Sequence, residues 1–280
     1  MSRLIQQCFA ARRAFVAVVL LPLLMTVASC GKQGGEQESD MSVPLTDAEI
    51  AAVASQRIVF AHQSVGNNIL EGVQSLTGQH GKPLTVVESR QAPEEWQGIA
   101  HFKVGENGKP LGKIEQFAQI MNADGFAQAD VAMLKLCYID FDGGATDPEK
   151  LAASYGDTLA QLQSRYPQTR FVAMTVPLTT IQTGPKAWVK KLLGRAPAGY
   201  EDNLRRQQFN ERLRARFSGD SLFDVARLEA SAGTQTFEYQ SRQVEALNPS
   251  YTYDGGHLNE QGKAVIAAEF VKFLASQSGT

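Results

Sequence analysis

Two short loops of this 280-residue chain carry residue types that suit nucleophilic catalysis. The first loop contains Ser64, within the segment AHQSVGNN (61–68), between a predicted strand and a predicted helix. A serine at such a place exposes its hydroxyl beside the unpaired N–H groups of the helix start, which suits a nucleophile and one half of an oxyanion site. A plain helix N-cap is the competing interpretation of the same serine.

The second loop lies near the C-terminus, in the segment YDGGHLN (253–259), where Asp254 and His257 are three residues apart. A histidine base needs an acidic partner that fixes its tautomer and stabilises its protonated form. One glycine-rich turn can supply both groups. A capping turn with a surface histidine explains the same pattern, but this alternative loses weight because Ser64 and His257 both project from loops that flank the predicted sheet.

Alternating strand and helix signals predict the framework that positions these loops. The predicted strands are short and apolar, and they cover residues 57–61, 84–87, 131–137, 171–176 and 222–225. The predicted helices repeat apolar residues three and four apart, and they cover residues 66–77, 111–122, 148–165, 202–217 and 259–276. This alternation predicts an α/β domain with a five-stranded parallel sheet covered on both faces. Ligands of such sheets bind beyond the carboxyl ends of the strands.

In its motifs and order of elements the sequence resembles the SGNH (GDSL-like) hydrolase family, which has its serine after the first strand and Asp-x-x-His before the last helix. The block DGGHLNEQG (254–262) carries most of the likeness, whereas HQS (62–64) stands where the family often has Gly-Asp-Ser. The resemblance implies a three-layer α/β/α, flavodoxin-like fold. It also implies an esterase in which Ser64 is the nucleophile, His257 the general base and Asp254 the orienting carboxylate.

The resemblance further implies an oxyanion hole made by the serine N–H, a glycine N–H after the second strand and an asparagine side chain after the third. Gly105 is the candidate glycine, in the segment HFKVGENG (101–108). The third predicted strand ends KLCYID (135–140), so no asparagine stands where the family has one. We therefore expect Asn107 to be the substitute donor, with a plain Asn-Gly turn as the alternative.

The N-terminus has the pattern of an export signal. Three arginines precede or adjoin residues 14–29, an apolar run of sixteen that is short for a membrane span of roughly 20 residues. The run ends in VASC, which resembles a bacterial lipobox, so we expect residues 1–29 to be removed and Cys30 to carry lipid. An ordinary signal peptide is the alternative. Residues 30–46 then form a flexible tether and residues 47–280 the hydrolase-like domain.

Composition argues against several other classes of protein. A formal net charge of -2 means that the chain lacks the overall positive charge that binds nucleic acid without regard to sequence. Three cysteines are too few for a zinc cluster or a disulfide framework. No phosphate-binding motif has the required spacing, so we expect neither a metal nor a cofactor.

The lipobox predicts a lipid anchor in the bacterial cell envelope, and Gly31 after the cysteine favours the outer membrane, facing the periplasm.

These observations predict a lipid-anchored serine esterase. The expected location in the cell envelope favours O-acetyl groups of a glycan as the substrate. Small esters and lipids are the alternative substrates. The same triad could transfer the acetyl group to a sugar hydroxyl instead of water. A non-catalytic glycan-binding lipoprotein is the alternative from another class, and the oligomeric state is left open.

Four residues near the predicted loops have no settled role. Cys137 ends a predicted buried strand, so we expect a packed thiol rather than a nucleophile. His101 is expected in a loop on the side of the site, and the role of His62 is open. Asp140 either lines the site or caps the next segment.

The connection at 178–200 is longer than the usual two to six residues and contains Trp188 with three lysines. A lid or substrate wall and a solvated amphipathic helix both fit this composition. A membrane-facing segment is a third interpretation.

Overall fold

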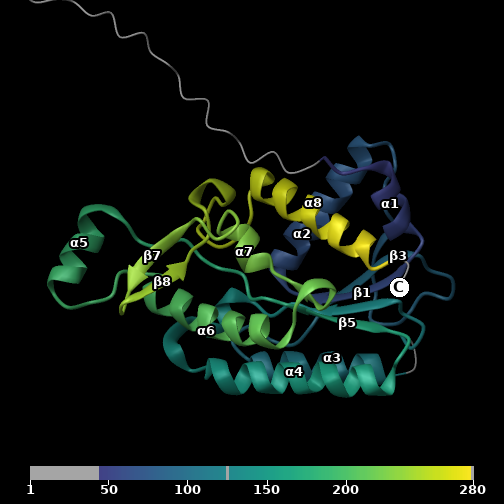
Figure 1. Cartoon of the computed structure of the whole chain (residues 1–280), viewed down its shortest axis with the longest axis horizontal. Coiled ribbons are helices and arrows are strands. Elements are labelled where there is room, and N and C mark those ends of the chain that lie inside the picture. Colours follow the sequence, from purple (N-terminus) through teal and green to yellow (C-terminus); the bar gives the residue numbers. More distant parts are fainter. Residues whose placement is uncertain (1–43, 124–125, 279–280) are drawn as a thin grey trace, which may run out of the picture. The chain divides into compact units, whose positions relative to one another are not determined.

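Six short segments pair side by side in a parallel sheet, which is shown in the computed structural model of Figure 1. The structure describes residues 44–123 and 126–278. The strands are β1 (Arg57–His62), β2 (Val86–Glu88), β3 (Gly98–Lys103), β4 (Val131–Leu134), β5 (Arg170–Met174) and β6 (Leu222–Phe223). Their order in the sheet is β2-β3-β1-β4-β5-β6. The predicted signal peptide, Cys30 and most of the tether lie outside the described residues.

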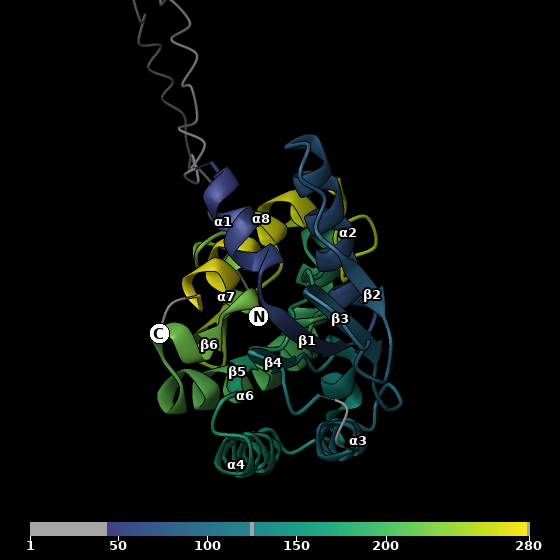
Figure 2. The ribbon, with the colours of Figure 1, turned by 90° about the vertical axis from the view of Figure 1, so that its right-hand side faces the viewer.

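Helices cover both faces of this sheet. The helices are α1 (Asp47–Ala54), α2 (Ser64–Gln79), α3 (Pro110–Asn122), α4 (Pro148–Arg165), α5 (Gly184–Leu192), α6 (Tyr200–Arg216), α7 (Val225–Glu229) and α8 (Glu260–Ser276). Figures 1 and 2 show α1, α2 and α8 on one face of the sheet and α3, α4 and α6 on the other. No helix in the described part of the chain has the length and apolar character needed to cross a membrane.

Side chains along β1 alternate between the two helix layers. Ile58 and Phe60 belong to the core cluster that includes residues of α1, α2 and α8, whereas Val59 and Ala61 belong to the cluster that includes residues of α3, α4 and α6. All four side chains are fully buried, as is typical of a strand in the middle of a parallel sheet. The three-layer α/β/α fold expected from the sequence is confirmed.

The expected count of five strands is wrong, because β3 lies between β2 and β1 and makes a sixth. The strand has the sequence GIAHFK, in which a histidine and a lysine interrupt the apolar pattern. His101 therefore lies in a strand, in register with Phe60, and not in the expected loop. Helix α1 and an antiparallel hairpin of β7 (Thr236–Tyr239) and β8 (Arg242–Glu245) are also absent from the sequence-based prediction.

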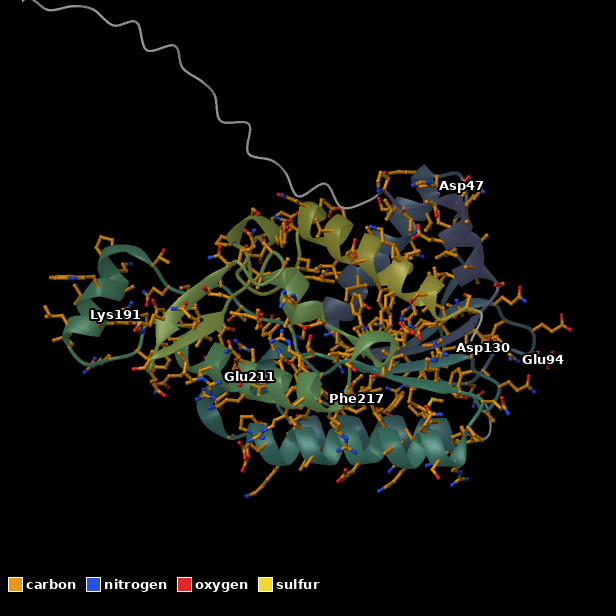
Figure 3. The ribbon with its side chains drawn as sticks, in the orientation of Figure 1. Asp47, Glu94, Asp130, Lys191, Glu211 and Phe217 are labelled. Carbon is orange, nitrogen blue, oxygen red and sulfur yellow. The ribbon has the colours of Figure 1, made fainter. Side chains whose placement is uncertain are left out.

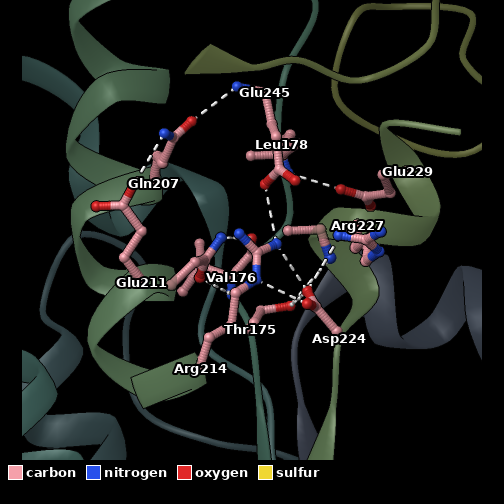
Figure 4. Close-up of polar contacts among 12 residues, drawn as sticks. Thr175, Val176, Leu178, Gln207, Glu211, Arg214, Asp224, Arg227, Glu229 and Glu245 are labelled. Atoms are coloured by element: carbon pink, nitrogen blue, oxygen red, sulfur yellow. Dashed lines mark hydrogen bonds and ion pairs between the residues drawn. The ribbon is translucent and has the colours of Figure 1, made fainter. Parts of the chain in front are cut away.

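Polar side chains from α6 and α7 hold the segment that continues β5 beyond the sheet. The Val176 N–H donates to Asn210 Oδ1 (2.7 Å), and the Leu178 N–H donates to Glu229 Oε2 (2.6 Å). Figure 4 shows Glu229 reaching Leu178 across the gap between the two segments. Because Asn210 and Glu229 are fully buried, these bonds are shielded from water and hold the backbone of residues 176–178 in place.

Candidate active site

Ser64 is the first residue of α2 and follows β1 after a single intervening residue. The N-cap of α2 is Gln63, whose side chain makes no capping bond, so the N-cap interpretation of Ser64 is wrong. Instead, Ser64 Oγ lies 2.9 Å from Nε2 of His257. The backbone N–H of Ser64 belongs to the first helical turn, where N–H groups have no acceptor within the helix.

His257 is held on its other side by Asp254. His257 Nδ1 lies 2.7 Å from Asp254 Oδ2, and the backbone N–H groups of Gly256 and His257 donate to Asp254 Oδ1 at 2.9 and 2.8 Å. The hydrogen bond with the His257 ring and these two N–H groups hold the pKa of Asp254 well below its ordinary value. An ionised acceptor at this place puts the ring proton on Nδ1 and leaves the Nε2 lone pair facing the Ser64 hydroxyl.

Close packing of α2 against α8 brings the serine and histidine loops together. A Cβ atom on Gly72 of α2 would lie 2.5 Å from the carbonyl oxygen of Lys263 on α8, so the two backbones meet where only glycine fits. Near the helix starts, the Leu258 N–H donates to Asn68 Oδ1 at 3.2 Å. The two loops are therefore aligned by the helices that follow them.

The histidine loop also contacts the segments that follow β4 and β5. The Thr180 N–H donates to the Gly255 carbonyl oxygen at 2.8 Å. The ring of Tyr138 packs edge-on against the ring of His257, with their centroids 5.8 Å apart, and a Cβ atom on Gly256 would lie 2.8 Å from Tyr138 Cζ. Tyr138 was not among the residues expected at the site, although its place directly after the third predicted strand, where the resemblance expects an asparagine, could have indicated it.

The loop after β3 differs from the predicted oxyanion hole. The Gly105 N–H donates to Gln116 Oε1 at 2.7 Å, so this donor is already used, which corrects the expectation that it holds an oxyanion. Asn107 Oδ1 accepts from Lys113 Nζ at 3.0 Å. Among the contacts of the described residues, none joins Asn107 to Ser64, and the donor role of Asn107 stays a prediction.

Asp140 joins the loop after β3 to the loop after β4. Its carboxylate is fully buried and pairs with the buried ammonium of Lys113, which lies 2.8 Å from each oxygen. The same carboxylate accepts the N–H groups of Gly108 (2.9 Å) and Cys137 (2.8 Å). The contact with Cys137 caps the following 3₁₀ turn, so of the two roles left open for Asp140 the structure shows the cap. Cys137 itself is buried, as expected for a packed thiol.

Asp140→Ala is expected to lower the free energy of unfolding by about 3–5 kcal/mol, because it leaves the Lys113 ammonium buried without a counter-charge. Urea unfolding measures this loss. The control is Glu106→Ala, which breaks an exposed ion pair with Lys109 and should cost no more than about 1 kcal/mol. The double variant Lys113→Met/Asp140→Leu should recover the part of this loss that comes from the unpaired ammonium, whereas the N–H groups of Gly108 and Cys137 still lack their acceptor. Equal losses in Asp140→Ala and Glu106→Ala would contradict the structural role of the pair.

His62 is a structural residue beside the serine. Its Nδ1 lies 2.7 Å from the Gln63 carbonyl oxygen and its Nε2 lies 3.0 Å from His101 Nδ1. Burial lowers the pKa of His62 to about 3, so the ring is neutral at pH 7. A Cβ atom on Gly66 would lie 2.3 Å from this ring, so the first turn of α2 packs directly on His62.

The lowered pKa of His62 predicts a pH-dependent stability. In the unfolded chain this histidine titrates near 6.5, whereas in the folded protein it titrates at about 3. Between these two pKa values the unfolded state binds more protons than the folded state. The stabilisation that the neutral His62 ring gives to the folded state is therefore complete above about pH 6.5. As the pH falls toward 3, it is lost at up to about 1.4 kcal/mol per pH unit. We expect the difference in unfolding free energy between the natural protein and His62→Gln to shrink from pH 7 to pH 4, as measured by urea unfolding. A difference that is constant with pH would contradict this prediction.

Comparisons with known proteins identify a family and a fold. The model of the GDSL-like lipase/acylhydrolase family matches residues 73–270, a range that includes Asp254 and His257 and begins after Ser64. No curated protein matches the sequence with significance. Among solved structures, a Bacteroides fragilis protein provisionally named an acylhydrolase is 13% identical and superposes with a TM-score of 0.50, covering 82% of this chain and 94% of its own.

Two other solved structures are similar at lower scores. A GDSL-like lipase from Bacteroides thetaiotaomicron is 12% identical with a TM-score of 0.47, covering 81% of this chain and 94% of its own. A carbohydrate esterase of family 3 from Talaromyces cellulolyticus is 13% identical with a TM-score of 0.43, covering 79% and 95%. Likeness at such low sequence identity concerns the fold and not the substrate.

Proposed function

The chain belongs to the GDSL-like lipase/acylhydrolase family, and from this premise we propose that it is a serine esterase with Ser64, His257 and Asp254 as its catalytic triad. The observation that carries the proposal is the alignment of the His257 ring, with Nε2 2.9 Å from Ser64 Oγ and Nδ1 2.7 Å from Asp254 Oδ2. This is the arrangement of nucleophile, base and orienting acid that activates a serine. A non-catalytic glycan-binding protein would not need it.

In the proposed reaction, His257 Nε2 takes the proton of Ser64 Oγ while the oxygen attacks the ester carbonyl carbon. The Ser64 N–H and the side-chain amide of Asn107 donate to the oxyanion. His257 then gives its proton to the leaving alcohol, which breaks the ester bond and leaves an acyl group on Ser64. Water, deprotonated by His257, releases the acid and restores the serine. Asp254 stays ionised throughout and stabilises the imidazolium.

A cavity beside Asp254 supports a sugar as the alcohol part of the ester. We name it the alcohol pocket; it has a volume of about 480 Å³, and its polar lining includes Tyr138, Asp142, Thr180, Asp202, Arg206 and Asp254. Three carboxylates outweigh one guanidinium, so the pocket suits hydroxyl or amino groups better than an anionic polymer. This lining favours an O-acetyl group on a neutral or amino sugar as the substrate.

Exposure of the triad favours hydrolysis over acetyl transfer. The side chains of His257 and Asp254 are 39% and 56% exposed, so water can reach the base that would activate it for attack on an acyl group on Ser64. Product analysis with an O-acetylated sugar donor and a free sugar acceptor separates the two reactions. Acetate as the main product supports hydrolysis, and acetylated acceptor as the main product supports transfer.

Labelling with a fluorophosphonate probe tests the proposed nucleophile. We expect one covalent adduct, located by peptide mass on the segment that contains Ser64, and we expect an O-acetylated sugar to slow its formation. Ser64→Ala is the matched control and should not react. An adduct on another residue, or an equal adduct on the control, would remove Ser64 from the mechanism.

We also propose that residues 1–29 are a lipoprotein signal peptide and that Cys30 carries lipid. Residues 30–46 would then tether the domain of residues 47–280 to the outer membrane, facing the periplasm. The pattern of arginines, apolar run and VASC supports this proposal. Metabolic labelling with palmitate should mark the natural chain and not Cys30→Ser, and labelling of both chains would contradict it.

A further inference from the structure

Helix α5 presents an apolar face that is largely exposed in the described part of the chain. Only Ala187 of this helix is buried. Trp188, Val189, Leu192 and Leu193 are 65%, 46%, 71% and 65% exposed. They are half of the large apolar residues that are exposed among the described residues, and they lie within six consecutive positions. Such a concentration indicates a surface for interaction.

The exposed residues share the side of α5 that faces away from the domain. With 3.6 residues per turn, Trp188 and Leu192 are neighbours on one face, and Ala187 and Lys191 lie on another. The Lys191 ammonium lies 4.8 Å from the ring centre of Tyr200, which fixes this second face toward the domain. Figure 1 shows α5 beyond β7 and β8, at the left end of the view, and Figure 3 labels Lys191 there. The apolar face therefore points to solvent.

All charged residues of the segment that carries this face are positive. Segment 183–199 contains Lys186, Lys190, Lys191 and Arg195 and no acidic residue, although acidic residues outnumber basic ones in the whole chain, 29 to 27. Exposed tryptophan and leucine beside several lysines are typical of helices that lie in the interface of an anionic bilayer. A symmetric contact between two copies would place these cations opposite one another, which disfavours a second copy as the partner.

We propose that α5 is an interfacial helix that binds the surface of an anionic phospholipid bilayer. Trp188 and Leu192 enter the boundary between headgroups and acyl chains, and Lys186 and Lys190 contact the headgroups. This surface is separate from the triad and does not depend on the proposed esterase activity. Residues 181–182 and 198–199, which flank the α5 segment, line the alcohol pocket, so a bilayer bound to α5 lies near the rim of that pocket.

Fluorescence of Trp188 tests this proposal directly. The chain has two tryptophans, so the full-length variant Trp96→Phe keeps Trp188 as its sole reporter. Phosphatidylglycerol vesicles should shift its emission to the blue, and lipids brominated in their acyl chains should quench it. Phosphatidylcholine vesicles should do neither, and high salt should weaken the effect. Because the signal comes from α5 itself, membrane binding through the N-terminus does not mimic it.

Variants made in the same Trp96→Phe chain test whether vesicle binding depends on the exposed residues of α5 or on other parts of the molecule. Lys186→Gln/Lys190→Gln and Leu192→Ser should each raise the lipid concentration at half-maximal shift by about tenfold or more. Leu111→Ser, at a residue of α3 that is 53% exposed, is the matched control and should leave it unchanged. An unshifted Trp188 on phosphatidylglycerol, or an equal shift on phosphatidylcholine, would overturn the proposal. So would a concentration-dependent blue shift without vesicles, which would identify a second copy as the partner. Ser64→Ala should bind vesicles like the natural protein, because the Trp188 signal does not depend on esterase activity. A failure of the esterase proposal would therefore leave the vesicle result unchanged.

Discussion

Replacing Ser64 by alanine is expected to lower kcat/KM for p-nitrophenyl acetate by about 10⁴-fold or more, a loss of about 5.5 kcal/mol of transition-state stabilisation. Among the described residues, Ser64 is the hydroxyl group that hydrogen-bonds to Nε2 of His257. Without it the base has no oxygen to activate, and only the binding and oxyanion contacts are left to assist attack by water. Initial rates of the purified proteins over a range of substrate concentrations measure this loss.

Ser75→Ala is the matched control, because Ser75 lies exposed on the same helix. This variant should keep the natural rate, and both variants should unfold at the temperature of the natural protein. A rate unchanged in Ser64→Ala would exclude Ser64 as the nucleophile. An equal loss of rate in both variants would show damage to α2 rather than removal of a reacting group.

Local sequence patterns predicted the elements whose apolar repeat is unbroken. β1 and α4 were expected within one residue of their observed bounds, because residues 58–61 of the strand are continuously apolar and the helix keeps its spacing to the end. β3 was missed because His101 and Lys103 break its short apolar run. The contact of His101 with His62 depends on a partner 39 residues away, which no local pattern contains.

The same distinction between local and distant contacts explains what was predicted of the site. Asp254 and His257 are three residues apart, so one turn brings them together and the motif is visible in the sequence. The partner of the Gly105 N–H is Gln116, eleven residues away on α3, and a glycine pattern cannot show that this N–H is already bonded. The ion pair between Lys113 on α3 and Asp140 in the segment after β4 likewise joins two separate parts of the chain and appears only in the fold.

Asp254→Asn is expected to lower kcat by about 10³–10⁴-fold with little change in KM. The asparagine Oδ1 can still accept the backbone N–H groups of Gly256 and His257, so the turn keeps its shape. Its Nδ2 group, however, would face His257 Nδ1 as a donor, and the ring would have to carry its proton on Nε2 instead. Nε2 would then donate to Ser64 Oγ and could no longer accept its proton. Steady-state kinetics over a pH series measure the change.

Two further variants separate this tautomer effect from damage to the loop. Asp254→Ala removes both the partner of the ring and the acceptor of the two N–H groups, so it should lose activity and thermal stability together. Asp157→Asn, at an exposed carboxylate paired with Arg216, should leave both unchanged. If Asp254→Asn kept the natural kcat, the carboxylate would be a turn residue only. The orientation of His257 would then have to come from its packing against Tyr138, because this ring contact is independent of the charge on Asp254.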